Sequence, residues 1–286
     1  MPVAQVNGAD ISYEIIGRGP LLVWTEGGRF GRNKLSYLFA GHFQRHYSVL
    51  LWDRRNAAGA SEIALSADPW YVMTDAEDLA ALLKHLDLGP AHLAGTSAGT
   101  SASLLVARAY PQIVQSLVLL HPPTDRHALA APFAESWLQL AETAESGGMQ
   151  AVTDTSQDTW DRERHGETLT FHTWPAESIH LNPKNRERLL AMDVDEFAET
   201  MRRWSDHIRA MIWPPGMTEE DLCQLECPTM IVPGRDTIHP RKVALRLAAL
   251  ISQARIADYP AESGAFSPES RVCKVFPEIE TFLSGL

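Results

Sequence analysis

Residues 93–99 read LAGTSAG, and this Gly-x-Ser-x-Gly spacing decides the fold prediction for the chain. A short apolar run, 91–94, precedes the motif, and a helix-like run, 100–108, follows it. Strand, sharp turn and helix is the context in which this spacing exposes a serine hydroxyl at the end of a sheet. A helix N-terminus beside Ser97 also favours developing negative charge. An ordinary Gly- and Ser-rich turn is the competing interpretation, so it is the flanking elements that favour a nucleophile.

Short apolar runs alternate with helical patterns on both sides of this motif. Residues 21–24 and 48–52 are continuous apolar runs, as expected of strands that are buried on both faces. Residues 75–88 instead carry apolar side chains at helical spacing. The alternation predicts an α/β fold with a mostly parallel sheet and right-handed crossovers. The length of 286 residues and the hydrophobic fraction of 45% suit one such unit with an insertion.

The pattern changes between residues 125 and 215, where the chain is polar, rich in charge and helical in periodicity. We predict a helical cap at 125–215, inserted into a core domain formed by 1–124 and 216–286. The inner face of a cap is where substrate selectivity is set. Tryptophans of this stretch are therefore candidates for lining the cleft, with ordinary cap core as the competing interpretation for each: Trp137, Trp160, Trp174 and Trp204.

Composition excludes several classes of function. The formal net charge of -11 argues against binding to nucleic acid and to anionic membranes. The sequence shows no signal-peptide pattern and no apolar run of about 18 residues, so we expect a cytoplasmic protein without a membrane partner. The three cysteines are too scattered for a disulfide framework. No His or Cys spacing indicates a zinc site, and we expect no metal.

Three motifs occur in an order that resembles a known superfamily. WDRR at 52–55 followed by GAS at 59–61 resembles a D-x-R-G-x-G-x-S loop, and LAGTSAG at 93–99 resembles a nucleophile elbow. VPGRD at 232–236, followed by His239 and a proline, resembles the loop that carries the catalytic acid. Together they resemble the α/β-hydrolase superfamily, in the lidded group of small esterases, lactonases and carbon–carbon bond hydrolases. The resemblance implies a twisted, mostly parallel eight-stranded sheet flanked by helices, with an inserted helical cap.

The resemblance also implies roles for individual residues. Ser97 is the expected nucleophile, and Asp236 the acid that orients the base. Backbone N–H groups of Ala98 and Gly28 are the expected oxyanion donors. Glu26 stands where the family usually has histidine. Further candidate substrate contacts are Glu26, Arg29 and Phe266. No cofactor is implied, the expected partner is a small-molecule substrate, and a homodimer is left open.

The histidine expected after the last strand is missing. Residues 263–266 read SGAF, so Ala265 occupies its position, and alanine cannot accept the serine proton. An engineered His→Ala substitution in a normal enzyme is the preferred interpretation, and a natural binding protein that has lost activity is the second. A third is a substitute histidine. His239 is too close to Asp236 in the chain to be assured the right direction, and His121, which ends the sixth strand and could face the cleft, is interpreted as structural. The cap histidines are interpreted as surface residues: His165, His172, His180 and His207.

The sequence therefore predicts a serine hydrolase that acts on a small, fairly apolar ester or lactone through an acyl-enzyme at Ser97, disabled at Ala265. A serine at the elbow argues against the aspartate-based dehalogenase and epoxide hydrolase chemistry of the superfamily. The alternatives are a non-catalytic small-molecule binder or receptor, and a carbon–carbon bond hydrolase.

Overall fold

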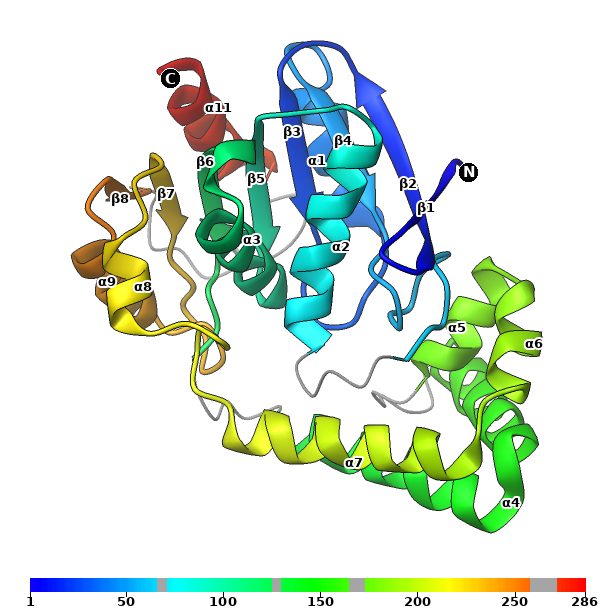
Figure 1. The fold of residues 1–286 in the computed structure, drawn as a ribbon. Coiled ribbons are helices and arrows are strands. Elements are labelled where there is room, and N and C mark those ends of the chain that lie inside the picture. Colours follow the sequence, from blue (N-terminus) through cyan, green and yellow to red (C-terminus); the bar gives the residue numbers. More distant parts are fainter. Residues whose placement is uncertain (66–70, 125–129, 165–172, 258–271) are drawn as a thin grey trace.

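The computed structural model describes residues 1–65, 71–124, 130–164, 173–257 and 272–286. Its strands form one eight-stranded sheet in the order β1-β2-β4-β3-β5-β6-β7-β8 (Figure 1). The pairs β1–β2 and β2–β4 are antiparallel, and every pair from β4 to β8 is parallel. The predicted fold class is thereby confirmed. The strands are β1 (Val3–Val6), β2 (Ala9–Gly17), β3 (Leu21–Thr25), β4 (Ser48–Trp52), β5 (Ala91–Thr96), β6 (Val114–Leu120), β7 (Thr229–Val232) and β8 (Ala254–Ile256).

Helices cover both faces of the sheet, and alternate residues of the central strands meet them. In β3, Val23 faces the core shared with α2 (Tyr71–His85), α3 (Ala98–Ala109) and α9 (Arg241–Leu250). Trp24, the next residue, faces the core shared with α1 (Lys34–Phe43) and α11 (Phe276–Ser284). Side chains alternate between the faces of a strand, so a strand buried on both faces must be apolar throughout. This explains the continuous apolar runs of the sequence. A short 3₁₀ helix (Pro111–Ile113) leads into β6.

All the regular secondary structure that is described between β6 and β7 is helical. Helix α4 is broken at Gly148, where φ is 72° and ψ is -177°, and α7 is capped by Asp193, whose side chain accepts the N–H of Glu196. In Figure 1, α4 and α7 lie side by side across the carboxyl ends of the parallel strands. The predicted helical insertion is thus confirmed, while its limits at 125 and 215 stay a prediction. Its helices are α4 (Ala130–Arg164), α5 (Trp174–Leu181), α6 (Lys184–Leu190) and α7 (Val194–Ala210), followed by α8 (Glu219–Cys223).

One corner of this cap is fixed to the core through a buried asparagine. The Asn185 Oδ1 atom accepts the N–H of Ile63 at 3.1 Å, and its Nδ2 atom donates to the carbonyl of Ser61 at 2.9 Å. Arg188 adds ion pairs to Asp10 at 2.8 Å and to Glu62 at 3.1 Å. The α5–α6 end of the cap is therefore anchored to the loop that follows β4.

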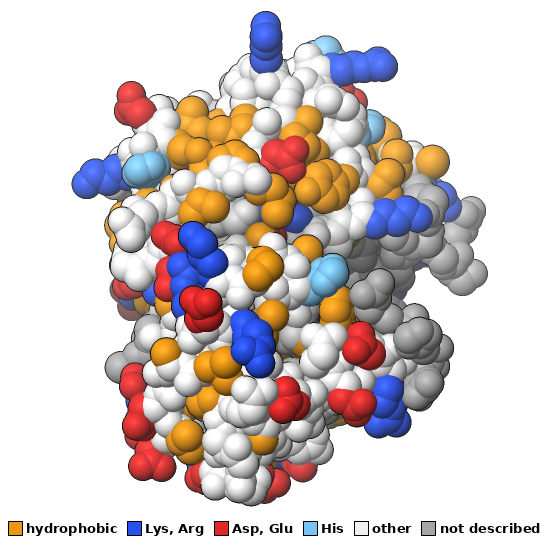
Figure 2. All heavy atoms as spheres, turned by 90° about the vertical axis from the view of Figure 1, so that its right-hand side faces the viewer, with side chains coloured by type: hydrophobic (Ala, Val, Ile, Leu, Met, Phe, Trp, Pro, Cys, Tyr) orange, Lys and Arg blue, Asp and Glu red, His pale blue; other side chains and the backbone are white. Residues whose placement is uncertain are grey.

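The outside of the cap is charged, whereas its inside is a third apolar core. Acidic side chains gather along the lower edge of the face shown in Figure 2, where the cap lies. Inside, Trp137 packs edge-on against Trp204 with ring centroids 5.7 Å apart. A charged outer face and an apolar inner face are expected of amphipathic helices that pack over the ends of the strands. Among the described residues, no helix is long and apolar enough to cross a membrane.

Candidate active site

Ser97 stands in a strained turn between β5 and α3. Its φ is 50° and its ψ is -119°, a combination that L-residues rarely adopt and that marks functional sites. A Cβ atom on Gly95 would lie 2.4 Å from the carbonyl oxygen of Gly99, and one on Gly99 would lie 2.3 Å from that of Thr25. The two glycines of the motif are therefore needed for the close approach of strand and helix.

The Ser97 hydroxyl is hydrogen-bonded to a histidine that the sequence analysis set aside. The Nε2 atom of His239 lies 2.9 Å from the Oγ atom of Ser97. On the other side of the ring, Nδ1 lies 3.0 Å from each carboxylate oxygen of Asp236. Serine, histidine and aspartate thus form one continuous chain of hydrogen bonds, the arrangement of a catalytic triad.

The loop after β7 explains how His239 and Asp236 meet, although only two residues separate them. The Asp236 carboxylate accepts the backbone N–H groups of Ile238 at 2.8 Å and His239 at 2.7 Å, which closes a tight turn. A Cβ atom on Gly234 would lie 2.2 Å from the Cβ atom of His239, so the loop folds back directly onto that glycine. His239 therefore faces the serine, a direction that its closeness to Asp236 in the chain did not assure.

The environment of Asp236 keeps it ionised. Partial burial alone would raise the pKa of its carboxyl group, but the hydrogen bonds from the ring and the backbone N–H of His239 outweigh burial and lower that pKa. An ionised carboxylate accepts the Nδ1–H of His239 and leaves Nε2 facing Ser97 as the proton acceptor. Ala265 and Phe266, which the sequence analysis placed at this site, lie outside the described residues.

The turn after β3 faces the elbow. A Cβ atom on Gly27 would lie 3.0 Å from the Cβ atom of Ser97, so the turn packs directly on the serine. The N–H of Gly27 is bonded to the Glu26 carboxylate at 3.3 Å, which makes the N–H of Gly28 the candidate oxyanion donor of this turn. Gly28 has a φ of 48° and lines the same cavity as Ala98, the first residue of α3.

A cavity of about 300 Å³ opens at Ser97 and His239. The cap and the segment that returns from it cover this cavity with apolar side chains: Phe133, Trp137, Ile208, Met211 and Trp213. Of the predicted tryptophans, Trp137 lines the cavity. Trp174 and Trp204 belong to the cap core, with ring centroids 6.4 Å apart. Trp160 instead packs against His180 in a tilted arrangement, with ring centroids 4.8 Å apart.

The charged residues predicted at the site are held by partners within the protein. Glu26 lines the cavity, and its carboxylate accepts hydrogen bonds from the Trp24 indole at 2.8 Å and the Ser36 hydroxyl at 2.7 Å. Arg29 also lines it and pairs with the buried Asp75 at 2.7 Å. Both side chains therefore stabilise the wall of the cavity. Within the described residues, no group of three His, Cys, Asp or Glu side chains could hold a metal ion.

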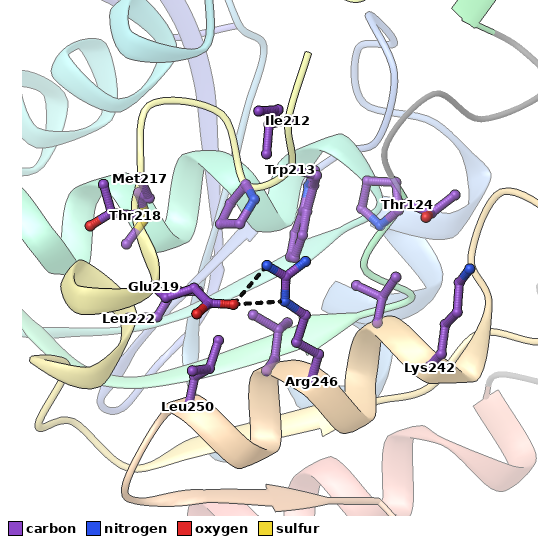
Figure 3. Close-up of a pocket in the computed structure, with 14 residues that line it drawn as sticks. Thr124, Ile212, Trp213, Met217, Thr218, Glu219, Leu222, Lys242, Arg246 and Leu250 are labelled. Atoms are coloured by element: carbon purple, nitrogen blue, oxygen red, sulfur yellow. Dashed lines mark hydrogen bonds and ion pairs between the residues drawn. The ribbon is translucent and has the colours of Figure 1, made fainter.

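A second cleft of about 490 Å³ adjoins the first, and Trp213 and Pro123 line both. Figure 3 shows Trp213 above α9, with Arg246 and Glu219 joined by an ion pair of 2.8 Å at the mouth of this cleft. The indole N–H of Trp213 donates to the Ser101 hydroxyl at 3.0 Å. The segment that returns from the cap is thereby fixed to the elbow helix α3 and forms the wall between the two cavities.

Comparison with known proteins agrees with the fold. The model of the alpha/beta hydrolase fold family matches residues 28–262. The chain belongs to the α/β-hydrolase fold family. Among curated relatives of this α/β-hydrolase is the uncharacterized hydrolase YraK of Bacillus subtilis, which is 30% identical over 118 residues. That alignment covers 41% of this chain and 43% of the relative, so the chain matches less than half the length of YraK.

Solved structures share the α/β-hydrolase fold over nearly the whole chain. The enol-lactonase of Burkholderia xenovorans LB400 superimposes with a TM-score of 0.63 at 19% identity, covering 99% of this chain and all of the other. The carboxylesterase CesB of Bacillus subtilis gives a TM-score of 0.66 at 18% identity, covering 99% and 91%. At these identities the similarity shows the fold alone.

Sequence reasoning missed several residues at the site of this α/β-hydrolase. His239 carried a signal in the sequence, because it follows the acid in a Gly- and Pro-bounded loop after a buried strand. Phe133 and Met211 carried none, since their place in the cavity depends on how α4 and α7 pack over the strand ends.

Proposed function

We propose that this protein is a serine hydrolase that cleaves small, uncharged, largely apolar esters or lactones. The observation that carries the proposal is the hydrogen-bond chain from Ser97 Oγ through His239 to Asp236. A serine hydroxyl alone is a weak nucleophile at neutral pH, and an adjacent oriented base activates it. His239 fills the role of the missing histidine. In this proposal the chain is therefore competent to hydrolyse its substrate, and Ala265 has no part in the reaction.

The reaction proceeds in two halves. In the first, His239 Nε2 takes the proton from Ser97 Oγ as this oxygen attacks the carbonyl carbon, and the new oxyanion faces the N–H groups of Gly28 and Ala98. The bond to the leaving oxygen then breaks, and His239 returns the proton to that oxygen. In the second half, a water molecule gives a proton to Nε2 and attacks the acyl carbon. The bond between that carbon and Ser97 Oγ then breaks, and His239 returns the proton to Oγ, which releases the acid and restores the Ser97 hydroxyl.

The cavity supports the choice of substrate. Its volume of about 300 Å³ lies at the lower end of ligand pockets, and its cover from the cap is apolar. Arg29 is paired with Asp75, and Glu26 adds a carboxylate to the wall, so an anionic acyl group would meet a cavity of unsuitable charge. An enol-lactonase and a carboxylesterase among the structural neighbours support esters and lactones as the class to test first.

The test is hydrolysis of short-chain p-nitrophenyl esters and aryl lactones by the protein as it stands, compared with Ser97→Ala. We expect turnover that falls by about 10³-fold or more in the variant, because the nucleophile is lost. Labelling by a fluorophosphonate, located by mass spectrometry, should occur at Ser97. A protein that binds these esters without turnover or labelling would instead be the non-catalytic binder.

A further inference from the structure

Glu26, Gly27 and Gly28 form a turn that we call the oxyanion turn. The buried side chain of Arg54, in the loop after β4, holds this turn. Arg54 follows β4 and is 2% exposed. Its Nη2 atom donates to the carbonyl oxygen of Gly27 at 3.0 Å and to that of Gly28 at 2.7 Å. Its Nη1 atom lies 3.3 Å from Asp75, which also pairs with Arg29 at 2.7 Å. The guanidinium group is therefore fixed from both sides.

The bond to Gly27 bears directly on the candidate oxyanion donor. The carbonyl of Gly27 and the N–H of Gly28 belong to one peptide group, and in a planar trans peptide these two bonds point in opposite directions. A cation that holds the carbonyl on one side therefore aims the N–H to the other side. A charge-assisted hydrogen bond to the carbonyl also polarises the peptide and makes its N–H a stronger donor.

This peptide needs an external anchor because its residues are glycines. Gly28 has a φ of 48°, and glycine exchanges readily between such conformations and others. The Glu26 carboxylate provides a second anchor on the same turn by accepting the N–H of Gly27. The peptide groups on both sides of Gly27 are therefore held before substrate arrives, the first through its N–H and the second through its carbonyl.

We infer that Arg54 is a positioning residue that aims the Gly28 N–H at the oxyanion formed on Ser97. The inference rests on the proposed function. Arg54 acts through the peptide and contacts no reacting atom. Its removal should therefore weaken binding of the tetrahedral state more than binding of the ground state, because preorganised donors act mainly on the charge that develops in the transition state.

Arg55 provides a matched control. It is the adjacent residue, is also buried at 6% exposure, and also pairs with an acid, since two of its nitrogens each lie 2.6 Å from Asp78. Its other bond reaches the carbonyl of Asn7 at 2.7 Å. A loss that merely reflects a disturbed buried arginine would appear in both positions.

The experiment compares Arg54→Lys with Arg55→Lys through two inhibitors. Phenylboronic acid forms a tetrahedral adduct with an activated serine and places an oxygen at the oxyanion position, whereas benzyl alcohol needs no such donor. For Arg54→Lys we expect the inhibition constant of the boronate to rise about tenfold or more and kcat to fall similarly, with benzyl alcohol binding and KM within about twofold. Arg55→Lys should lower the Tm and leave the ratio of the two constants unchanged.

An unchanged ratio in Arg54→Lys, or an equal change in Arg55→Lys, would overturn the inference. If Arg54→Lys does not fold, Arg54→Met serves in its place, because it keeps an unbranched side chain at this buried position and removes the donor to the Gly27 carbonyl; the same rise in the ratio is expected and its absence overturns the inference. Failure of the proposed function looks different: the unaltered protein would not turn over esters, and it would bind the boronate no better than Ser97→Ala does.

Discussion

The Nε2 atom of His239 lies 2.9 Å from the Oγ atom of Ser97, across 142 residues of sequence. His239 is carried by the same short loop as Asp236, with which it shares a backbone turn and a side-chain hydrogen bond. Acid and base of the proposed relay are therefore positioned by one loop after β7. The relay does not depend on a histidine after β8.

Removal of the charge on Asp236 should disable the relay and leave the fold intact. In Asp236→Asn, the amide oxygen can still accept the backbone N–H groups of the turn, but an amide nitrogen facing Nδ1 favours the wrong tautomer of His239. We expect kcat to fall by about 10²- to 10⁴-fold, with the Tm little changed. Wild-type turnover in this variant would show that the aspartate has no role in the reaction.

The cap should become less stable in acid because of one histidine. Burial lowers the pKa of His207, in α7, to about 4. The unfolded chain takes up this proton below about pH 6.5, whereas the folded protein takes it up only near pH 4. Stability from this group is therefore lost as the pH falls from about 6.5 to 4, with a slope of up to roughly 1.4 kcal/mol per pH unit.

Urea unfolding at several pH values checks this expectation. His207→Gln should reduce the slope over that window, while His85→Gln, on the core helix α2, provides a control for a general histidine effect. Equal slopes in the wild type and in His207→Gln would rule out His207 as the origin.

The fold and the serine were predictable because their signals are local. The glycines around Ser97 are separated by fixed short distances, and strands buried on both faces are apolar in every position. His239 was set aside because chain proximity says nothing about direction, which here depends on the turn closed by Asp236 and Gly234. The cavity-lining tryptophans could not be sorted from sequence, because Trp137 and Trp204 lie in one apolar cluster and differ only in which side of it they form.

Asn185 should contribute more to stability than the neighbouring Asn182. Asn185→Ala leaves the buried N–H of Ile63 and the carbonyl of Ser61 without this partner, at a cost of about 2–3 kcal/mol. Asn182 is half-buried and makes one bond, of 3.0 Å, to the carbonyl of Ala60, so Asn182→Ala should cost about 1 kcal/mol or less. Urea unfolding of the two variants measures the difference, and equal losses would contradict the anchoring role of Asn185.

Phe133 should limit the size of the acyl group. Its ring lines the cavity at Ser97 and packs near Trp137, with centroids 6.2 Å apart. Phe133→Ala enlarges the cavity, so the acyl chain of the preferred p-nitrophenyl ester should become longer by about two to four carbons. Each further CH₂ that is buried in the enlarged cavity contributes about 0.8 kcal/mol to binding. Trp204→Phe, in the cap core, is the control: it should lower the Tm and keep the chain-length preference. A preference that is the same in Phe133→Ala and the wild type would place the acyl group elsewhere.

Whether His239 is the base is decided by kcat/KM for p-nitrophenyl acetate in two variants. We expect His239→Ala to lower kcat/KM by about 10³-fold or more and Ala265→His to leave it within about threefold of the wild-type value. If His239→Ala instead retains the starting activity and Ala265→His raises it by orders of magnitude, His239 is not the base and the chain lacks one.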